Sequence, residues 1–340
     1  MFNSNGKSAN TFHVLTYHRV AELQAGPHLN PGLISATPAL FAQQMMFLKE
    51  NFQVIAMADL LQSVRNGCPL PKRAVLITFD DAYRDFGENA WPVLKKWRLP
   101  VTVFVPTAYP DRPENRFWWD QLHQAIMHSQ RQCLQLAELG DIPLASSEQR
   151  RQGLKCVQTW IKNKPHTAAM ALVDEIYQQA EIAKNPASPV HRWEELRKLA
   201  SDGVTLGAHT RTHPILTRLP LQAAREEIIQ SQNDLKKEIG SVLPIFSYPD
   251  GGHHDGIVNI LKEEGFLLGF NGPAGHNDLS TADLFRIRRI NITPRSTELV
   301  FRLRLTRWFS SVERFRMRKR IQEITSTIEF EKESHDHAAN

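Results

Sequence analysis

The stretch AVLITFDD at residues 74–81 decides the fold class that we expect for this chain. Its first six residues form an apolar run with the length of a buried strand, and two adjacent carboxylates, Asp80 and Asp81, end it. Other short apolar runs recur along the chain and alternate with segments of helical periodicity. This alternation predicts an α/β fold with a mostly parallel sheet.

The expected strands are followed in most cases by a helical segment. They lie at residues 12–17, 54–55, 75–79, 101–105, 204–208, 243–248, 266–270 and 285–292. Seven or eight such units suit an irregular (β/α) barrel, in which functional side chains stand where the strands end. Polar residues follow the apolar runs at 80–81, 209–213 and 248–250, so we expect these three sets at one face of the barrel.

A second motif, HTRTH at residues 209–213, follows the apolar run 204–208. Pro214 disfavours a helix at His213, so we expect a loop or a first turn there. Taken alone, the histidines can be structural, and Asp80 and Asp81 can simply start a turn. Taken together, two imidazoles and one carboxylate form a catalytic zinc environment with an open fourth position, and the other carboxylate can accept a proton from water.

Two regions depart from the strand-and-helix alternation. Residues 111–190 are helix-like, rich in Gln, Ala and Leu, and we expect a helical insertion without strands in a barrel domain that spans residues 12–293. Residues 294–340 are predicted to form a basic amphipathic helix and a polar tail, with arginines interleaved with apolar residues such as Phe301 and Trp308. Such a helix can lie on an anionic membrane surface or pack on the barrel with a solvated basic face. No nucleic-acid partner is expected.

Composition bounds the class of protein. The chain has 340 residues, of which 41% are hydrophobic and 23% charged, as in ordinary globular proteins, and a net charge of +5. Its three cysteines form no CxxC pair, so neither a disulfide framework nor a zinc knuckle is indicated. Residues 1–8 lack the apolar core of a signal peptide. We therefore expect a cytoplasmic location, with the basic helix in peripheral contact with the inner face of the membrane.

Three motifs resemble, in order and spacing, the first three motifs of the polysaccharide deacetylase family (the NodB-homology domain, carbohydrate esterase family 4 type). They are TFDD at 78–81, HTRTH at 209–213 and FSYPDG at 246–251. Weaker likeness is found in LTYHRV at 15–20 and FWWD at 117–120. The resemblance therefore runs from about residue 12 to residue 293.

The resemblance implies a distorted (β/α) barrel that hydrolyses N-acetyl groups, less often O-acetyl groups, of glycans. Carried over by position, Asp80 is the general base. Asp81, His209 and His213 bind a divalent metal, usually Zn²⁺. A metal held by three protein ligands lowers the pKa of a bound water and polarises the acetyl carbonyl.

The third motif implies the wall that faces the oxyanion. The backbone N–H of Asp250 faces the developing charge, and Tyr248 and Pro249 belong to the substrate-binding surface beside it. This chain departs from the family pattern here, because Ser247 stands where an arginine is frequent and Asp250 where a tyrosine is frequent.

The last family motif usually brings a histidine as general acid, but residues 285–292 contain none. We expect Arg288 or Arg289 to replace the missing arginine, and we count Arg289 among the substrate-binding residues. His18 ends the first expected strand and is the candidate acid; the alternative is a buried histidine bonded to backbone.

These observations predict a metal-dependent hydrolase that removes N-acetyl groups from sugars of a glycan or a lipid-linked glycan precursor. The alternatives are an O-acetyl esterase with the same site and a catalytically impaired glycan-binding protein. Retention of Asp80 beside a full ligand set favours an enzyme, because a binding protein needs no base beside a metal.

Overall fold

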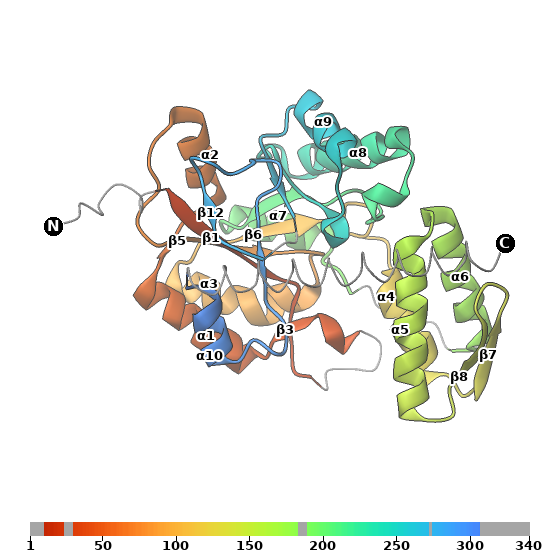
Figure 1. Ribbon diagram of the computed structural model, residues 1–340. Helices are drawn as coiled ribbons and strands as arrows, with labels where there is room; N and C mark the ends of the chain where they lie inside the picture. Colours follow the sequence, from red (N-terminus) through yellow and green to blue (C-terminus); the bar gives the residue numbers. More distant parts are fainter. Residues whose placement is uncertain (1–9, 24–29, 183–188, 272–273, 307–340) are drawn as a thin grey trace, which may run out of the picture.

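A parallel sheet forms the centre of the fold in the computed structural model, which describes residues 10–23, 30–182, 189–271 and 274–306 (Figure 1). Its neighbouring strands run in the order β11-β10-β9-β6-β5-β1-β12, while β4 pairs with β5 and β13 with β1. All of these pairs are parallel except β1 with β12. The strands are β1 (Thr11–Tyr17), β4 (Gln53–Val54), β5 (Ala74–Phe79), β6 (Thr102–Val105), β9 (Thr205–Ala208), β10 (Ile245–Ser247), β11 (Leu268–Phe270), β12 (Asn277–Asp278) and β13 (Ile290–Asn291).

The sheet curls, and one segment connects β11 at one end with β1 near the other end. Ile287 bridges Phe270 of β11, and three and four residues further along the chain Ile290 and Asn291 pair with β1. The seven strands along the path therefore form the curled, distorted half-barrel that the sequence predicts.

Side chains of β5 alternate between two hydrophobic clusters, as the pleat of a strand requires. Val75, Ile77 and Phe79 pack in one cluster, whereas Ala74 and Leu76 pack in the other with residues from across the sheet. All six residues of β5 are buried, which explains why the sequence shows a continuous apolar run there.

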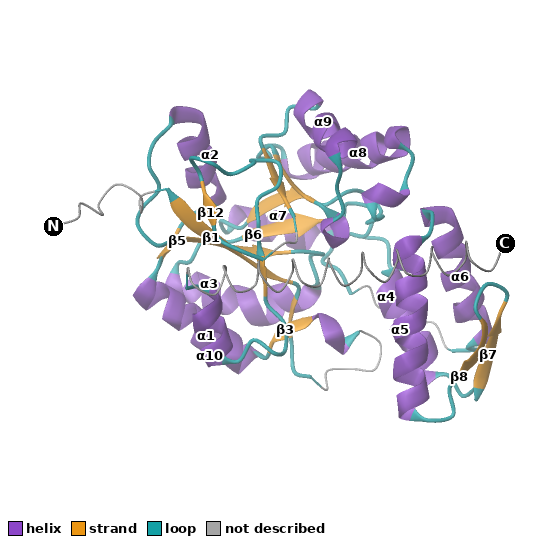
Figure 2. Cartoon of the chain, in the orientation of Figure 1, coloured by secondary structure: helices purple, strands orange, loops and turns teal. Residues whose placement is uncertain are grey.

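Helices surround the sheet, with α1, α3 and α10 on one side of it and α8 and α9 on another (Figure 2). Outside the insertion they are α1 (Pro38–Asn51), α2 (Met57–Asn66), α3 (Trp91–Trp97), α7 (Trp193–Ser201), α8 (Leu221–Ile239), α9 (Asp255–Glu263) and α10 (Glu298–Arg304). Short turns are η1 (Pro31–Leu33), the π-helical η2 (Phe86–Ala90), η3 (Leu216–Arg218) and η4 (Pro249–Gly251), and β2 (Arg19–Val20) pairs with β3 (Ile34–Ala36). Helix α1 begins after Thr37, whose side chain accepts the Leu40 N–H, and has a proline at its first position.

The insertion is a separate helical lobe beside the sheet (Figure 1). Helices α4 (Trp118–His128), α5 (Ser147–Asn163) and α6 (His166–Gln179) enclose their own hydrophobic cluster. The expectation that this region has no strand is wrong, since β7 (Cys133–Leu136) and β8 (Gly140–Pro143) form an antiparallel hairpin. Leu134 and Leu136 alternate with exposed residues, a two-residue period that the Gln- and Leu-rich composition masks.

The predicted basic C-terminal helix begins at α10, which packs on the barrel. Phe301 is buried and its ring meets Phe47 of α1 edge-on at 6.2 Å. The rest of the expected helix and tail, residues 307–340, lies outside the described residues. Within the described ranges, no helix has both the length and the apolar character needed to cross a membrane.

Candidate active site

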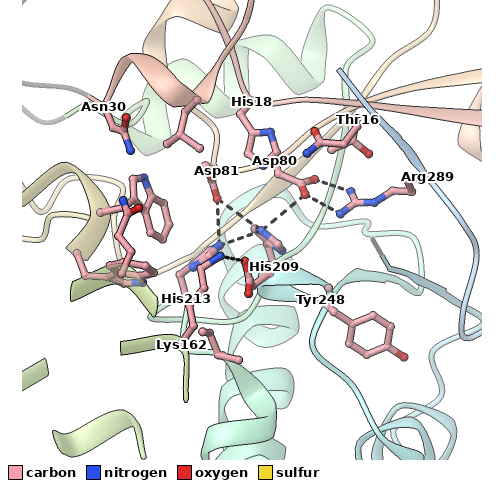
Figure 3. Close-up of a pocket in the computed structure, with 18 residues that line it drawn as sticks. Thr16, His18, Asn30, Asp80, Asp81, Lys162, His209, His213, Tyr248 and Arg289 are labelled. Atoms are coloured by element: carbon pink, nitrogen blue, oxygen red, sulfur yellow. Dashed lines mark hydrogen bonds and ion pairs between the residues drawn. The ribbon is translucent and has the colours of Figure 1, made fainter. Parts of the chain in front are cut away.

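Asp80 and Asp81 reach one cavity from the end of β5 (Figure 3). Leu76, Thr78 and Asp80 lie on the same face of the strand because side chains alternate. The Asp80 N–H donates to the Tyr17 carbonyl at 2.9 Å and so continues the pairing of β1 with β5. At Asp81 the backbone turns to a φ of 71°, which lets the next carboxylate enter the cavity as well. Both carboxylates are buried.

His209 and His213 come from the loop after β9. Gly207 precedes them, and a Cβ there would lie 2.8 Å from the ring of Phe104, so only glycine fits beneath the loop. The loop is then held by hydrogen bonds. The Thr210 hydroxyl accepts the His213 N–H at 3.1 Å.

Glu227 of α8 anchors the same loop from outside. Its carboxylate accepts the backbone N–H groups of Arg211 and Thr212, each at 2.8 Å, and the Thr212 hydroxyl at 2.7 Å. Glu227 therefore binds the loop between the two histidines without entering the cavity. The sequence gives no signal for this role, because an acidic residue on an amphipathic helix is ordinarily solvated.

Left-handed backbone conformations concentrate at the site. Of the nine non-glycine residues with positive φ in the described ranges, four belong to the three motifs: Asp81, Thr210, His213 and Asp250. A fifth, Ala82, directly follows the first motif. Each such conformation costs about 1–3 kcal/mol, and strained residues of this kind cluster at functional sites. The fold holds these loops against local preference.

The ligand atoms of Asp81, His209 and His213 converge. Asp81 Oδ1 lies 3.1 Å from His213 Nε2 and 3.5 Å from His209 Nε2, and the two Nε2 atoms are 3.2 Å apart. Ligands placed tetrahedrally at zinc distances lie about 3.3 Å from one another. His209 Nδ1 lies 2.8 Å from the Ser247 carbonyl, which can only accept, so the neutral ring protonates Nδ1 and leaves the Nε2 lone pair free for a metal. The donor set fits a divalent cation.

Charges within this cluster shift its pKa values. Burial raises the pKa of Asp81, but the imidazoles of His213 and His209 more than offset this effect and hold it well below the ordinary range. Burial lowers the pKa of His209, but the carboxylates of Asp80 and Asp81 outweigh that effect, and the pKa is raised. The cluster thus favours one cationic group beside Asp81, either a protonated imidazole or a metal ion.

Arg289 stands against Asp80. Its Nη1 and Nη2 donate to Asp80 Oδ1 and Oδ2, both at 2.8 Å, and its Nε donates to the Asn271 carbonyl. Burial raises the pKa of Asp80, but the Arg289 guanidinium and His209 outweigh it, and the pKa is lowered. Arg288, the other expected candidate, is exposed. The Ser247 hydroxyl, at the position where the family has its arginine, donates to Asp80 Oδ2 at 3.3 Å.

His18 and Asp250 border the same cavity, whose volume is about 370 Å³. His18 follows β1, and its backbone N–H donates to the Ser35 hydroxyl at 2.9 Å. Burial lowers the pKa of the His18 imidazole, partly offset by the carboxylates of Asp81 and Asp80. The exposed Asp250 carboxylate lies 2.5 Å from Lys162 Nζ of helix α5.

Tyr248 and Pro249, the expected substrate-binding residues, differ in whether they border the cavity. The Tyr248 ring points away from the metal-ligand cluster (Figure 3), and its hydroxyl donates to the Phe285 carbonyl at 2.9 Å. Pro249 is buried and is absent from the cavity lining, whereas Tyr248, Asp250 and Gly251 belong to it. The tyrosine hydroxyl therefore links the segment after β10 to the segment that closes the sheet, on which Phe285 lies.

An aromatic wall lies against His213. The Trp119 ring meets the imidazole edge-on at 4.7 Å, and its indole N–H donates to the Tyr83 hydroxyl at 2.8 Å. Tyr83 in turn donates to Asp120, whose other oxygen accepts the Asn30 N–H. Burial raises the pKa of Asp120 to about 7. The motif FWWD thus reaches the site through a chain of contacts that the sequence alone does not show.

Fold and site together combine a curled α/β half-barrel with a buried donor set that fits a divalent cation. The polysaccharide deacetylase family pattern matches residues 68–135 and 155–268, which together are more than half of the chain. The chain belongs to the polysaccharide deacetylase family.

Curated relatives share shorter stretches. The chain is 28% identical over 108 residues to the poly-beta-1,6-N-acetyl-D-glucosamine N-deacetylase of Escherichia coli (strain K12), a match that covers 32% of this chain and 16% of that protein. It is 34% identical over 76 residues to the protein of the same name from Staphylococcus aureus (strain MSSA476), covering 22% of this chain and 26% of the relative. The match thus spans about a quarter or less of the length of these relatives.

Solved structures share the fold. The Streptococcus pyogenes deacetylase PplD in complex with acetate aligns over 87% of this chain and 98% of its own, with a TM-score of 0.57 and 18% identity. IcaB from Ammonifex degensii aligns over the same shares with a TM-score of 0.56 and 18% identity. At this identity the likeness shows the distorted barrel alone.

Proposed function

We propose that this chain is a metal-dependent N-deacetylase that removes acetyl groups from N-acetylhexosamine residues of a glycan or a lipid-linked glycan precursor. The observation that carries the proposal is the placement of Asp80. This carboxylate is buried, held by both Nη atoms of Arg289, and its Oδ2 lies 3.9 Å from His209 Nε2. A carboxylate kept ionised beside a metal-ligand set can accept the proton of a water that attacks an amide carbonyl.

Asp81, His209 and His213 would hold the metal, and the donor set of one carboxylate and two imidazoles is that of zinc. A cation bound there would lower the pKa of a water molecule toward neutrality and polarise the acetyl carbonyl. The two cationic side chains of the cavity pair with other carboxylates: Lys162 with Asp250 and Arg289 with Asp80. Neither of them therefore competes with a metal for Asp81.

The chain's own residues then divide the proton transfers. Asp80 accepts a proton from the attacking water, and Arg289 fixes the orientation of the carboxylate and keeps its pKa low. The backbone N–H of Asp250 stabilises the negative charge that develops on the acetyl oxygen. His18, which lines the same cavity beside Asp80 and Asp81, gives a proton to the departing sugar nitrogen.

The names of two relatives support the substrate class that we propose. Two of them carry the name poly-beta-1,6-N-acetyl-D-glucosamine N-deacetylase, so a β-1,6-linked N-acetylglucosamine oligomer is the first substrate to test. The bidentate contact of Arg289 with Asp80 argues for an enzyme over a glycan-binding protein, because it supplies the arginine that the third motif lacks.

The experiment measures acetate release by the zinc-loaded protein from such oligomers, with O-acetylated glycans as a second substrate class. We expect acetate from the N-acetylated oligomers and a fall of about 10²–10⁴-fold in kcat for Asp80→Asn, the usual contribution of a general base. The zinc content of the variant, measured by mass spectrometry, should equal that of the wild type. Release from O-acetyl groups only, or equal rates for Asp80→Asn and wild type, would contradict the proposal.

A further inference from the structure

The helical insertion supplies one wall of the cavity that holds Asp80 and Asp81. Gln158 and Lys162 of α5 and Trp118 of α4 all line it. Gln158 and Lys162 are four residues apart, so they share one face of the helix, next to the buried Val157 and Ile161 that pack into the lobe. The side chains of this wall belong to none of the three motifs that form the metal and base.

The C-terminal end of α5 is fixed from two sides. Lys162 Nζ forms an ion pair with Asp250 Oδ1 at 2.5 Å. Arg218 Nε, in the turn that follows the His213 loop, donates to the Lys162 carbonyl at 2.9 Å, and its Nη2 donates to Asn163. The wall is therefore tied to the segment that carries Asp250 and to the segment that follows the histidines.

Trp118 extends the wall from α4. Its ring meets Trp119 edge-on at 5.4 Å, and Trp119 contacts His213. Trp118 is half-buried, with one part packed on the hydrophobic clusters of the barrel and of the lobe. A partly exposed indole that borders a cavity offers an apolar face against which a sugar ring can stack.

The charges of the lining favour an uncharged ligand. Each ammonium or guanidinium group in the lining has a carboxylate partner: Lys162 has Asp250, and Arg289 has Asp80. Recognition of a phosphate or a carboxylate uses cations that are free to form charge-assisted pairs. This wall offers instead an amide, an indole and an ammonium whose remaining two N–H groups can donate to hydroxyls.

We propose that Gln158, Lys162 and Trp118 form a subsite for an uncharged sugar residue next to the residue that is deacetylated. The inference rests on the proposed function and deepens it. A sugar held by Lys162 lies beside Asp250, the residue whose N–H faces the acetyl oxygen, so the subsite positions a neighbouring residue of the same glycan chain. The protein therefore selects uncharged oligosaccharides over monosaccharides.

The test compares Lys162→Ala and Gln158→Ala in the zinc-loaded protein. The measured quantity is the ratio of kcat/KM for a β-1,6-linked N-acetylglucosamine pentasaccharide to that for N-acetylglucosamine. We expect this ratio to fall about tenfold in each variant, the effect of one lost hydrogen bond of about 1.4 kcal/mol. Lys155→Ala is the matched control, because Lys155 is exposed on the same helix outside the cavity, and its ratio should equal that of the wild type.

Calorimetric binding of the pentasaccharide to the same three variants separates the outcomes. Acetate release by the wild type with an unchanged ratio in both variants overturns the subsite alone. No acetate release, but weaker binding in Lys162→Ala and Gln158→Ala than in Lys155→Ala, overturns the proposed function and supports the subsite. Absence of both release and binding overturns both, and a preference for an oligosaccharide that alternates N-acetylglucosamine with glucuronate overturns the uncharged class.

Discussion

Arg289 donates hydrogen bonds to both carboxylate oxygens of Asp80, with two N–O distances of 2.8 Å, although the two residues are 209 positions apart in the chain. Asp80 ends β5, whereas Arg289 lies on the last segment, which connects β11 to β1. The closing segment of the barrel therefore also supplies the partner of Asp80, the carboxylate that we propose as the general base.

Replacement of Arg289 by lysine should lower activity most at acidic pH. Arg289 lowers the pKa of Asp80, so loss of the bidentate contact raises it. A base acts only when ionised, and its activity is lost as pH falls through its pKa; a raised pKa moves the acid limb of the kcat/KM profile to higher pH. Arg288→Lys, a change at the exposed neighbour, should leave the profile in place. An acid limb that coincides in the two variants would contradict the role of Arg289.

Removal of the Arg289 guanidinium should also lower the free energy of unfolding. Arg289→Met leaves the buried Asp80 carboxylate without its cation, and breaking a buried pair in this way costs about 3–5 kcal/mol. Denaturant unfolding at pH 7 measures the difference, and the double variant Arg289→Met, Asp80→Asn should recover part of it. No recovery in the double variant would show that the loss comes from packing and not from the unpaired charge.

Metal binding should depend on pH through His209. Its pKa is raised above the ordinary value of 6.5, so protons compete with a metal at higher pH than they do for an ordinary histidine. We expect chelation to abolish activity, Zn²⁺ to restore it, and the Zn²⁺ affinity to fall as pH falls through the range in which His209 takes up a proton. At 100-fold excess over its Kd the metal adds about 2.7 kcal/mol of stability, which a thermal melt detects.

The matched pair for this measurement is His213→Ala and His254→Asn. His254 is exposed and caps α9 through its side chain, a role that asparagine can fill. We expect only His213→Ala to lose the thermal stabilisation by Zn²⁺. Equal stabilisation of both variants would place the metal elsewhere.

Glu227 should control metal affinity without touching the metal. Glu227→Ala removes the acceptor of two backbone N–H groups between His209 and His213, and loss of such an outer partner typically lowers metal affinity by about 10–100-fold. Glu226→Ala is the control, because the carboxylate of Glu226, the next residue on α8, accepts a hydrogen bond from Gln222 and not from the histidine loop. Competition with a fluorescent chelator measures both Kd values, and equal values would show that the loop keeps its conformation unaided.

The metal half of the site could be predicted from the sequence because its residues are local. Asp80 and Asp81 end one apolar run, and His209 and His213 follow another, so the rule that places strand ends at one face brings them together. The resemblance to the family then implied which of the two aspartates is the metal ligand. The choice between Arg288 and Arg289 could not be made this way. Both lie on a short irregular segment, and only the pairing of Ile290 with Leu15 fixes which side chain faces Asp80.

The remaining residues depend on contacts between distant segments. Lys162 and Glu227 are charged residues on helices, which by sequence alone belong to a solvated face, and their partners lie 88 and about 15 residues away. The buried Tyr248 ring points away from the metal-ligand cluster and donates its hydroxyl to the Phe285 carbonyl, a contact with the segment that closes the barrel. Such roles follow from tertiary packing, whereas the motifs only mark where the strands end.

His18 remains the residue whose role is most directly decided by experiment. It borders the cavity with Asp80 and Asp81, and burial lowers the pKa of its imidazole. An acid acts only when protonated, so its contribution is lost as pH rises through that pKa, and His18→Ala should abolish this basic limb of the kcat profile. A sugar amine needs a proton to depart, whereas 4-nitrophenolate does not. We therefore expect His18→Ala to lower kcat by about 10²–10⁴-fold on the N-acetylated oligomer and far less on 4-nitrophenyl acetate. Equal losses on the two substrates, with zinc retained, would assign His18 a structural role instead.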